Sequence, residues 1–256
     1  MRRHSIRVRS RFSVWAMIAS LHLHRVHGIG IAKSVAHMAL DRRSLARTSG
    51  LKFWKLLGTG SSDTFAVRDA DPTLWGFFGV WESIAAHQQF VDSSQVANSW
   101  RNRCDEQWSV ELKPLRWKGH WARRDPFASL ANEADPGGDS DHSDQSDHNG
   151  QIAVLTRARV KPSQWHAFSK AVPPVAAAMK HASGLRFSLG IGEAPIGLQA
   201  TFSVWDSPEA IAAFAYQGEA HRSVIKRTET SGWYAEELFS RYLVLKESGS
   251  ITGVTG

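Results

Sequence analysis

The sequence predicts an α+β fold made of two ferredoxin-like modules, each with the element order β-α-β-β-α-β. An internal repeat is the first observation behind this prediction. Residues 50–53 read Gly-Leu-Lys-Phe and residues 184–187 read Gly-Leu-Arg-Phe, while Val-Trp-Glu-Ser at 80–83 is matched by Val-Trp-Asp-Ser at 204–207. Motifs repeated in the same order indicate a duplicated module.

The spacing of aromatic residues is the second observation. Trp81 precedes Phe90 by nine residues, and Trp205 precedes Phe214 by the same interval. The next shared tryptophan follows Trp81 after 27 residues and Trp205 after 28 residues. Core packing common to both modules explains tryptophans that recur at matching positions.

In the first module, the periods of the apolar residues predict each element in turn. An apolar strand at 14–23 is followed by a helix at 29–43 and by two strands at 51–57 and 74–80. Ser83 is suited to cap a second helix. A final strand is expected at 108–115.

The second module follows the same order. We expect a strand at 152–160, a helix at 163–181 that begins after Pro162, strands at 185–191 and 197–204, and a last strand at 237–245. Ser207 is suited to cap the second helix, with Pro208 at its first position. Two such modules in one chain can place their sheets face to face and close a barrel with the helices outside.

Composition sets the expected boundaries. Residues 1–12 form a basic arm that carries five arginines, and residues 128–150 form an acidic linker without Lys or Arg. Segments with so little apolar content do not offset their ordering entropy, so we expect both to be disordered. The first module then spans 13–127, the second module spans 151–247, and a tail spans 248–256.

Residue content excludes several classes of function. A single cysteine, Cys104, rules out a disulfide framework and CxxC metal sites, and fits a cytoplasmic protein. His22, His24 and Arg25 interrupt the longest apolar run, so no segment is expected to span a bilayer. The net charge of +7 is concentrated in the arm. We therefore expect no nucleic-acid partner, and contact with a membrane surface stays open.

The histidines offer two candidate sites. His22 and His24 lie two apart on a strand, and such a pair can bind a metal, although neither a carboxylate nor a thiol accompanies them at useful spacing. His221 lies on the helical stretch before Trp233, and the matching stretch of the first module has no histidine. A residue that departs from the internal repeat is a candidate for function, because duplication supplies only the shared scaffold.

Several segments of both halves resemble the spheroidene monooxygenase family of carotenoid ketolases. The likeness covers about residues 18–245 and rests on Gly-Leu-Lys-Phe-Trp-Lys-Leu-Leu-Gly-Thr-Gly at 50–60, Gly-Ile-Gly-Glu-Ala-Pro at 190–195, and Gly-Trp-Tyr-Ala-Glu-Glu-Leu-Phe at 232–239. The helix with His221 is also similar to the proximal-histidine helix of heme-degrading monooxygenases, which have the dimeric α+β barrel fold. Where those proteins have an additional tryptophan, this chain has Phe214, which favours heme as a retained cofactor.

The resemblance implies an oxygen-dependent enzyme that introduces a keto group into an acyclic carotenoid, or a similar apolar substrate, by successive hydroxylations. It implies heme as the cofactor and dioxygen as the co-substrate. His221 would be the catalytic axial ligand of the heme iron, and Arg222 or Lys226 would pair with the heme propionates. The electrons would come from an external, ferredoxin-like donor.

Four aromatic residues on predicted strands are candidates to line a substrate channel, namely Phe53, Trp54, Phe187 and Phe202, although core packing explains each of them at least as well. Two other functions stay open at this point. One is a heme-binding or apolar-ligand-binding protein without turnover, and the other is a nucleic-acid-binding protein that uses the basic arm. We expect a cytoplasmic protein, with peripheral attachment to a membrane as a further alternative, since a carotenoid would be drawn from a membrane.

Overall fold

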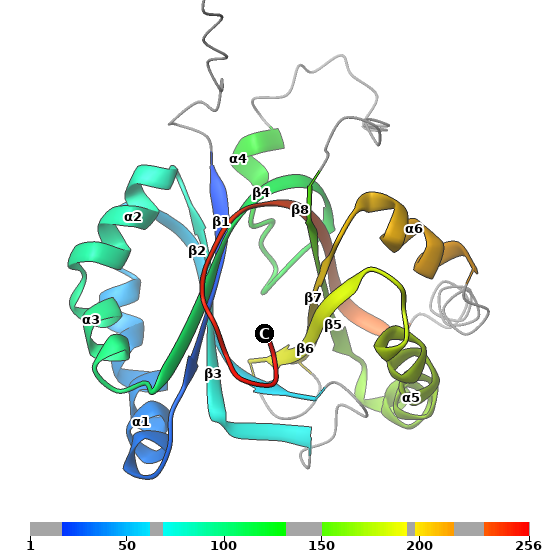
Figure 1. Ribbon diagram of the computed structural model, residues 1–256, viewed down its shortest axis with the longest axis horizontal. Helices are drawn as coiled ribbons and strands as arrows, with labels where there is room; N and C mark the ends of the chain where they lie inside the picture. Colours follow the sequence, from blue (N-terminus) through cyan, green and yellow to red (C-terminus); the bar gives the residue numbers. More distant parts are fainter. Residues whose placement is uncertain (1–16, 62–68, 132–149, 194–197, 218–232, 256) are drawn as a thin grey trace, which may run out of the picture.

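The computed structural model describes residues 17–61, 69–131, 150–193, 198–217 and 233–255 (Figure 1). The first half contains β1 (Ile18–Arg25), α1 (Ile29–Leu45), β2 (Leu51–Gly60), β3 (Ala70–Trp81), α2 (Ile84–Ser93), α3 (Gln95–Arg101) and β4 (Glu106–Gly119). A short helix, α4 (Ala128–Ala131), follows. The second half contains β5 (Ile152–Val160), α5 (Trp165–Lys180), β6 (Leu185–Gly192), β7 (Leu198–Trp205), α6 (Pro208–Gln217) and β8 (Tyr234–Gly249).

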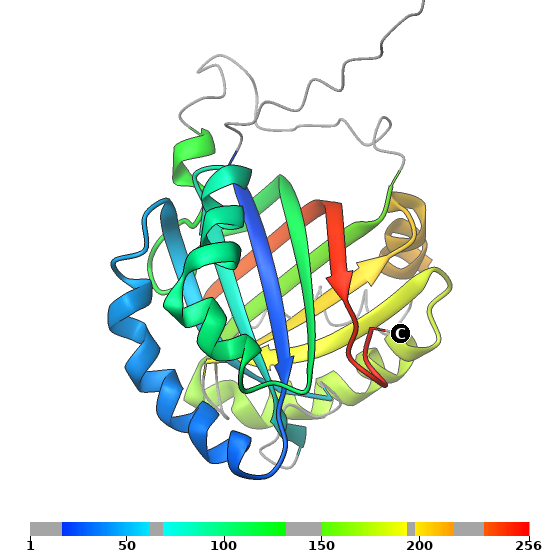
Figure 2. The same ribbon diagram turned by 60° about the vertical axis from the view of Figure 1, so that its left-hand side comes forward.

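The eight strands form one closed antiparallel barrel in the order β1-β3-β2-β6-β7-β5-β8-β4. Within each half the strands follow the same neighbour order, β4-β1-β3-β2 in the first and β8-β5-β7-β6 in the second. The halves meet along two seams. The β4–β8 seam is long, whereas the β2–β6 seam has three register pairs. Helices α1, α2 and α3 lie outside the first-half strands, and α5 and α6 lie outside the second-half strands (Figures 1 and 2).

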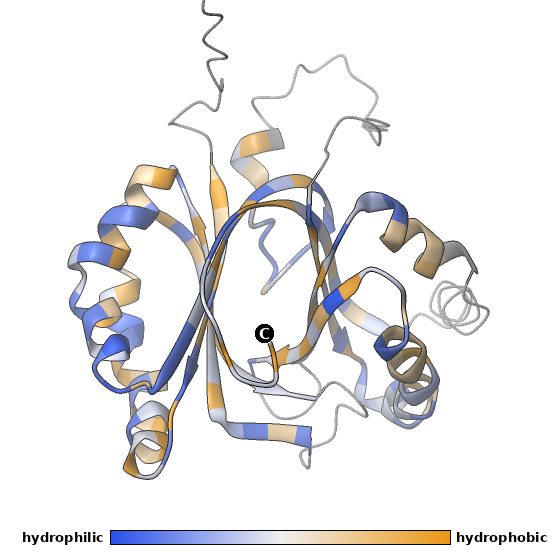
Figure 3. Ribbon diagram, viewed as in Figure 1, coloured by the Kyte–Doolittle hydropathy of each residue, from blue (hydrophilic) through white to orange (hydrophobic). Residues whose placement is uncertain are grey.

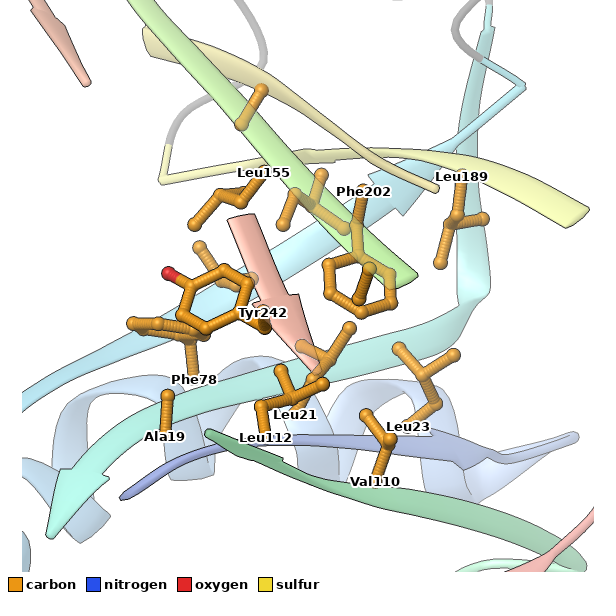
Figure 4. Close-up of a cluster of buried hydrophobic side chains, with 14 of the residues drawn as sticks. Ala19, Leu21, Leu23, Phe78, Val110, Leu112, Leu155, Leu189, Phe202 and Tyr242 are labelled. Atoms are coloured by element: carbon orange, nitrogen blue, oxygen red, sulfur yellow. The ribbon is translucent and has the colours of Figure 1, made fainter. Parts of the chain in front are cut away.

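The barrel interior is packed with apolar side chains from both halves, and Figure 4 shows part of this cluster. Leu21, Phe78, Leu155 and Phe202 are fully buried there. Tyr242 also lies in this core; its hydroxyl donates a hydrogen bond to Ser240 Oγ at 2.7 Å, and burial raises the pKa of the phenol. Alternation along each strand sends every second side chain into the barrel and the others toward the helices.

The repeated sequence motifs make the same contacts in both halves. Gly50 and Gly184 have φ of +74° and +77°, a region that favours glycine. A Cβ atom on either glycine would lie within 2.6 Å of an alanine Cβ on the following helix, Ala86 in the first half and Ala210 in the second. The glycine therefore allows the second helix of each half to pack closely on the sheet.

The predicted helix caps are confirmed. Ser83 Oγ accepts a hydrogen bond from the Ala86 amide at 3.1 Å, and Ser207 Oγ accepts one from the Ala210 amide at 3.3 Å. The first half has one helix that the sequence did not separate. Ser94 ends α2 and caps α3, because its hydroxyl accepts a hydrogen bond from the Ala97 amide at 3.0 Å.

Two expected boundaries differ from the structure. The predicted linker at 128–150 begins with helix α4, and Leu130 packs against the barrel core. The predicted tail at 248–256 includes the end of β8, and Ile251 is fully buried in the same core. The ordered structure extends beyond the predicted boundaries because Leu130 and Ile251 pack with the apolar core of the barrel. The arm at 1–12 and residues 132–149 of the linker lie outside the described residues.

Buried histidines fill the space between the first-half sheet and its helices. His22 Nε2 lies 3.0 Å from His87 Nε2, and His87 Nδ1 lies 3.1 Å from Glu111 Oε1. Because a carboxylate only accepts, His87 Nδ1 donates to Glu111; in neutral His87 the other nitrogen accepts from His22. Burial and the neighbouring His87 and His24 hold the pKa of His22 well below its ordinary value of 6.5.

His24 faces the same layer and lines a small cavity. Burial, and then the charge of Arg103, lowers the pKa of His24 from 6.5 to about 4. The cavity has a volume of about 30 Å³, and its lining includes His24, Asp41, Trp75 and Arg103. This is room for about two water molecules and far less than the roughly 300 Å³ of a typical ligand pocket.

The metal pair considered for His22 and His24 is not supported. Both residues face the same side of β1, as the spacing predicts, but in the described ranges no group of three side chains is arranged to hold a metal ion. His27 is exposed and contacts Asp105, with 2.9 Å between Nδ1 and Oδ2.

Among the described residues, every helix is too short or too polar to cross a bilayer.

We predict that Gly184→Ala lowers the free energy of unfolding by about 2–4 kcal/mol, because the new methyl group adds a clash with Ala210 to the backbone strain. Gly253→Ala is the matched control, since Gly253 has a φ of +73° and no atom would contact its Cβ within 4 Å. It should cost about 1–2 kcal/mol. Equal losses for the two variants in urea unfolding would contradict the close approach at Gly184.

The buried histidines predict acid sensitivity. Their pKa values are lower in the folded than in the unfolded state, so the unfolded state binds more protons and stability is lost as pH falls below 6.5. Each group contributes a slope of up to about 1.4 kcal/mol per pH unit. His24→Phe should flatten the dependence of unfolding free energy on pH between 6.5 and 4. An unchanged slope in urea titrations would show that His24 is not buried as a neutral ring.

Candidate functional site

The three residues that the sequence assigns to heme binding, His221, Arg222 and Lys226, lie outside the described residues. In the sequence they lie between Gln217, which ends α6, and Trp233, which precedes β8. Both of these elements belong to the second half.

The four candidate channel residues do not share one surface. Phe53, Phe187 and Phe202 point into the barrel, where they are buried in its apolar core. Trp54 follows Phe53 on the same strand and therefore faces the first-half helices, with the guanidinium carbon of Arg42 5.6 Å from its ring centre. A channel inside the barrel would thus include three of these side chains and exclude Trp54.

The barrel-facing phenylalanines make close aromatic contacts. The ring centres of Phe187 and Trp108 are 5.2 Å apart, those of Phe53 and Trp121 are 5.6 Å apart, and those of Phe187 and Phe202 are 6.2 Å apart. Contacts of this kind are typical of packed cores. The interior of the barrel is thus a structural core in the described part of the chain.

A group of charged residues lies beside the short β2–β6 seam, and three of them, Lys55, Glu193 and Glu236, belong to the segments that carry the family resemblance, although the sequence gave no role to them. Glu193 Oε1 lies 2.5 Å from Lys55 Nζ, and Glu193 Oε2 accepts a hydrogen bond from Trp121 Nε1 at 2.8 Å. Arg157, which is almost fully buried, pairs with Glu193 at 3.3 Å and also with Glu236. The pairing of β2 with β6 brings Lys55 close to Glu193, while the pairing of β5 with β8 places Arg157 close to Glu236.

The charges of this group are mutually compensated. Burial favours the neutral acid of Glu193, but the hydrogen bonds from Lys55 and Trp121 and the charges of Lys55 and Arg157 hold its pKa below the ordinary value. The guanidinium of Arg157 also stacks over the Trp121 ring, 5.7 Å from its centre. The contacts of Lys55 and Trp121 with Glu193 join the first half of the chain to the second half at this seam.

The helix-facing sides of the two sheets differ in side-chain size. The strand registers align the halves position by position, since Ile18 and Leu51 both pair with Trp81, and Ile152 and Leu185 both pair with Trp205. In this alignment the first-half residues His22, His24, Trp54, Leu56 and Phe77 correspond to the second-half residues Thr156, Ala158, Ser188, Gly190 and Thr201. At these five positions the side chain is large in the first half and small or absent in the second half.

We call Thr156, Ala158, Ser188, Gly190 and Thr201 the small-residue floor. It lies on strands β5, β6 and β7, and it belongs to neither of the two apolar clusters beneath the second-half helices. One cluster contains Phe168 and Trp233, and the other contains Trp205 with Phe214 packed against it. Along β5, Thr156 and Ala158 lie between Val154, which packs in one cluster, and Val160, which belongs to the other, whereas a single continuous cluster covers the first-half sheet.

The first half also provides a counterpart for the predicted ligand position. His221 follows Trp205 by 16 residues, and the residue that follows Trp81 by 16 is Ala97. Ala97 lies on α3, is 5% exposed and packs in the cluster between the sheet and the helices. The repeat thus relates His221 to a position that faces the sheet in the first half.

The comparisons with known proteins agree with this architecture. No family model matches the chain. Among solved structures, an aldoxime dehydratase superposes with a TM-score of 0.56 at 11% identity, covering 89% of this chain and 81% of that one. At this identity the likeness concerns the fold alone, an α+β protein with an antiparallel barrel.

Curated sequences show closer likeness. The chain is 30% identical to spheroidene monooxygenase of Rhodobacter capsulatus over 237 residues, which cover 92% of this chain and 93% of that protein. It is 32% identical to spheroidene monooxygenase of Rubrivivax gelatinosus over 200 residues, which cover 78% and 71%. Identity at this level over nearly the whole length shows that the chain belongs to the spheroidene monooxygenase family and is an oxygenase enzyme.

Proposed function

We propose that this oxygenase is heme-dependent and oxidises an acyclic carotenoid, or a similar apolar substrate, to a ketone. The observation that carries the proposal is the small-residue floor, because its five positions hold bulky residues in the first half. Loss of side-chain volume between a sheet and its helices is what a flat cofactor requires. The aromatic clusters on either side offer apolar contacts to such a ring system.

His221 is the proposed axial ligand of the heme iron. Its counterpart Ala97 faces the first-half sheet from α3, so the repeat favours an inward position for the imidazole. The ring must be neutral to bind iron through one nitrogen. Arg222 and Lys226 follow on the same stretch, and they are the proposed partners of the heme propionates.

Bound heme would supply the activation of dioxygen, which no protein side chain provides. The chain itself would hold the apolar substrate against the aromatic side chains and exclude water from the reacting carbon. A first hydroxylation converts a C–H bond to an alcohol, and a second at the same carbon gives a geminal diol that loses water to form the ketone. Each hydroxylation consumes one dioxygen, two electrons and two protons, places one oxygen atom in the substrate and releases the other as water. We propose an external, ferredoxin-like donor for the electrons.

The substrate class is proposed from the relatives. Both matched proteins are named spheroidene monooxygenase, and the chain shares most of its length with each. Because a carotenoid is an apolar polyene that partitions into lipid, its enzyme must reach a bilayer. We therefore propose a cytoplasmic protein that contacts a membrane surface peripherally.

We also propose that the fold arose as two fused ferredoxin-like modules that together replace a dimer, giving a dimeric α+β barrel type of fold. The equal strand order of the halves supports this, as do the matched contacts of Gly50 and Gly184. The two seams between the halves correspond to the interface that two separate copies would form.

The heme ligand can be tested by absorption spectroscopy of the full chain expressed with heme available. We predict a Soret band that shifts or disappears in His221→Ala, because the variant lacks the imidazole that binds iron. Exogenous imidazole should restore the band in the variant. A Soret band of unchanged position and intensity in His221→Ala would contradict ligation by this residue.

Turnover separates the enzyme from a protein that only binds heme. With an electron donor and a solubilised acyclic carotenoid, the intact chain should consume oxygen and form a ketone. Heme binding without oxygen consumption under these conditions would support the non-catalytic alternative.

Filling the small-residue floor should prevent heme uptake. We predict that Ser188→Trp, which introduces the side chain that Trp54 provides in the first half, weakens heme binding by about tenfold or more through overlap with the cofactor. Ser183→Trp is the matched control, since Ser183 is exposed in the turn before β6. Heme titration with a check of the thermal midpoint gives the result. Equal heme affinity of both variants would place the cofactor elsewhere.

A further inference from the structure

The outward side of α1 carries an unusual set of apolar residues. Ile29, Val35 and Leu40 are 75%, 56% and 66% exposed, and they are three of the four large exposed apolar side chains in the described part of the chain. Single exposed apolar residues are common on protein surfaces, but several on one helix indicate an interaction surface. Figure 2 shows α1 running along the outside of the molecule.

The other exposed positions on this side are small or basic. At about 100° per residue, Ile29, Lys33, Ala36 and Leu40 fall within one sector of roughly 60° on the helix surface, and Val35, roughly 120° from Ile29, marks the far edge of a face roughly 160° wide. We call the exposed residues of this side the outer face of α1: Ile29, Ala32, Lys33, Val35, Ala36, Ala39, Leu40 and Arg43. The colouring of α1 in Figure 3 shows its mixture of hydrophobic and hydrophilic residues.

The charge of α1 is positive on the outside. Lys33 and Arg43 belong to the outer face, and Arg42 is exposed beside it. The only acidic residue of the helix, Asp41, is buried on the opposite side, where it accepts hydrogen bonds from Trp100 Nε1 at 2.8 Å and His37 Nδ1 at 2.9 Å. No carboxylate of α1 therefore offsets the exposed cations.

We propose that the outer face of α1 rests on an anionic lipid surface. Ile29, Val35 and Leu40 would enter the boundary between headgroups and acyl chains, while Lys33 and Arg43 would contact lipid phosphates. Apolar side chains accompanied by cations are the combination that binds a helix to a membrane interface. This inference rests on the proposed function in one respect, since an apolar polyene substrate is taken from a bilayer.

The charge distribution favours lipid over a second copy of this chain. In a symmetric dimer built on this face, each subunit would present the same patch to the other, so Lys33 and Arg43 would oppose cations. Like charges that approach one another without a counterion oppose association. An anionic lipid surface compensates the same cations.

Vesicle binding by the full chain tests the proposal. The probe is sedimentation with phosphatidylcholine vesicles that contain phosphatidylglycerol, compared with phosphatidylcholine alone. We predict that combining Ile29→Ser, Val35→Ser and Leu40→Ser reduces the partition coefficient by about tenfold or more. Every variant keeps the basic residues 1–12, so their contribution to vesicle binding is constant. Phe239→Ser is the control, because it removes the fourth exposed apolar side chain, on β8, and should leave binding unchanged.

A second variant tests the cations. Lys33→Ala with Arg43→Ala should weaken binding to the anionic vesicles only, and the difference should shrink at high salt. Vesicle binding by the triple serine variant equal to that of the unmodified chain would overturn the proposal. So would a dimer, seen by sedimentation equilibrium, that the triple variant converts to monomer, because a second copy would then cover the face.

The readouts separate this proposal from the proposed function. Turnover of a detergent-solubilised carotenoid does not require a bilayer, so the triple serine variant should retain it. If neither protein oxidises the substrate while the difference in vesicle binding holds, the substrate assignment fails and the membrane face of α1 is supported.

Discussion

Closure of the barrel is the constraint on which the rest of the structure depends, because both seams join strands from different halves of the chain. At the short seam, Glu193 of the second half is bound by Lys55 and Trp121 of the first half. Arg157 completes this group from within the second half. A closed barrel leaves no sheet edge unpaired. The core inside the barrel is shared by both halves, whereas the outer face of each half packs against the helices of that half.

The helix-facing sides of the two halves differ, although both halves have the same strand order. The first-half sheet is covered by large side chains, among them His22 and Phe77, and the hydrogen bonds from His22 through His87 to Glu111 satisfy buried polar groups there. The second-half sheet has small residues at the matching positions. The space between sheet and helices in the first half is filled by large side chains, and the matching space in the second half is where we propose the cofactor and His221.

Sequence reasoning predicts elements better than it predicts contacts between distant segments. The repeat of Gly50 and Gly184 places two strands correctly because each glycine meets a local requirement, a positive φ beside a packed helix. The contact of Lys55 with Glu193 depends on the pairing of β2 with β6, which no local pattern encodes. The burial of Ile251 also depends on the tertiary structure, because its side chain is buried by contacts with the barrel core. The small-residue floor was readable from the repeat, but only once the strand registers fixed which positions correspond.

A crystal structure of the heme-loaded full chain would show whether the cofactor lies between the second-half sheet and its helices. We expect the porphyrin to lie over Thr156, Ser188 and Thr201, with iron bound by His221. Heme found inside the barrel or against the first-half sheet, or iron bound by another side chain, would contradict it.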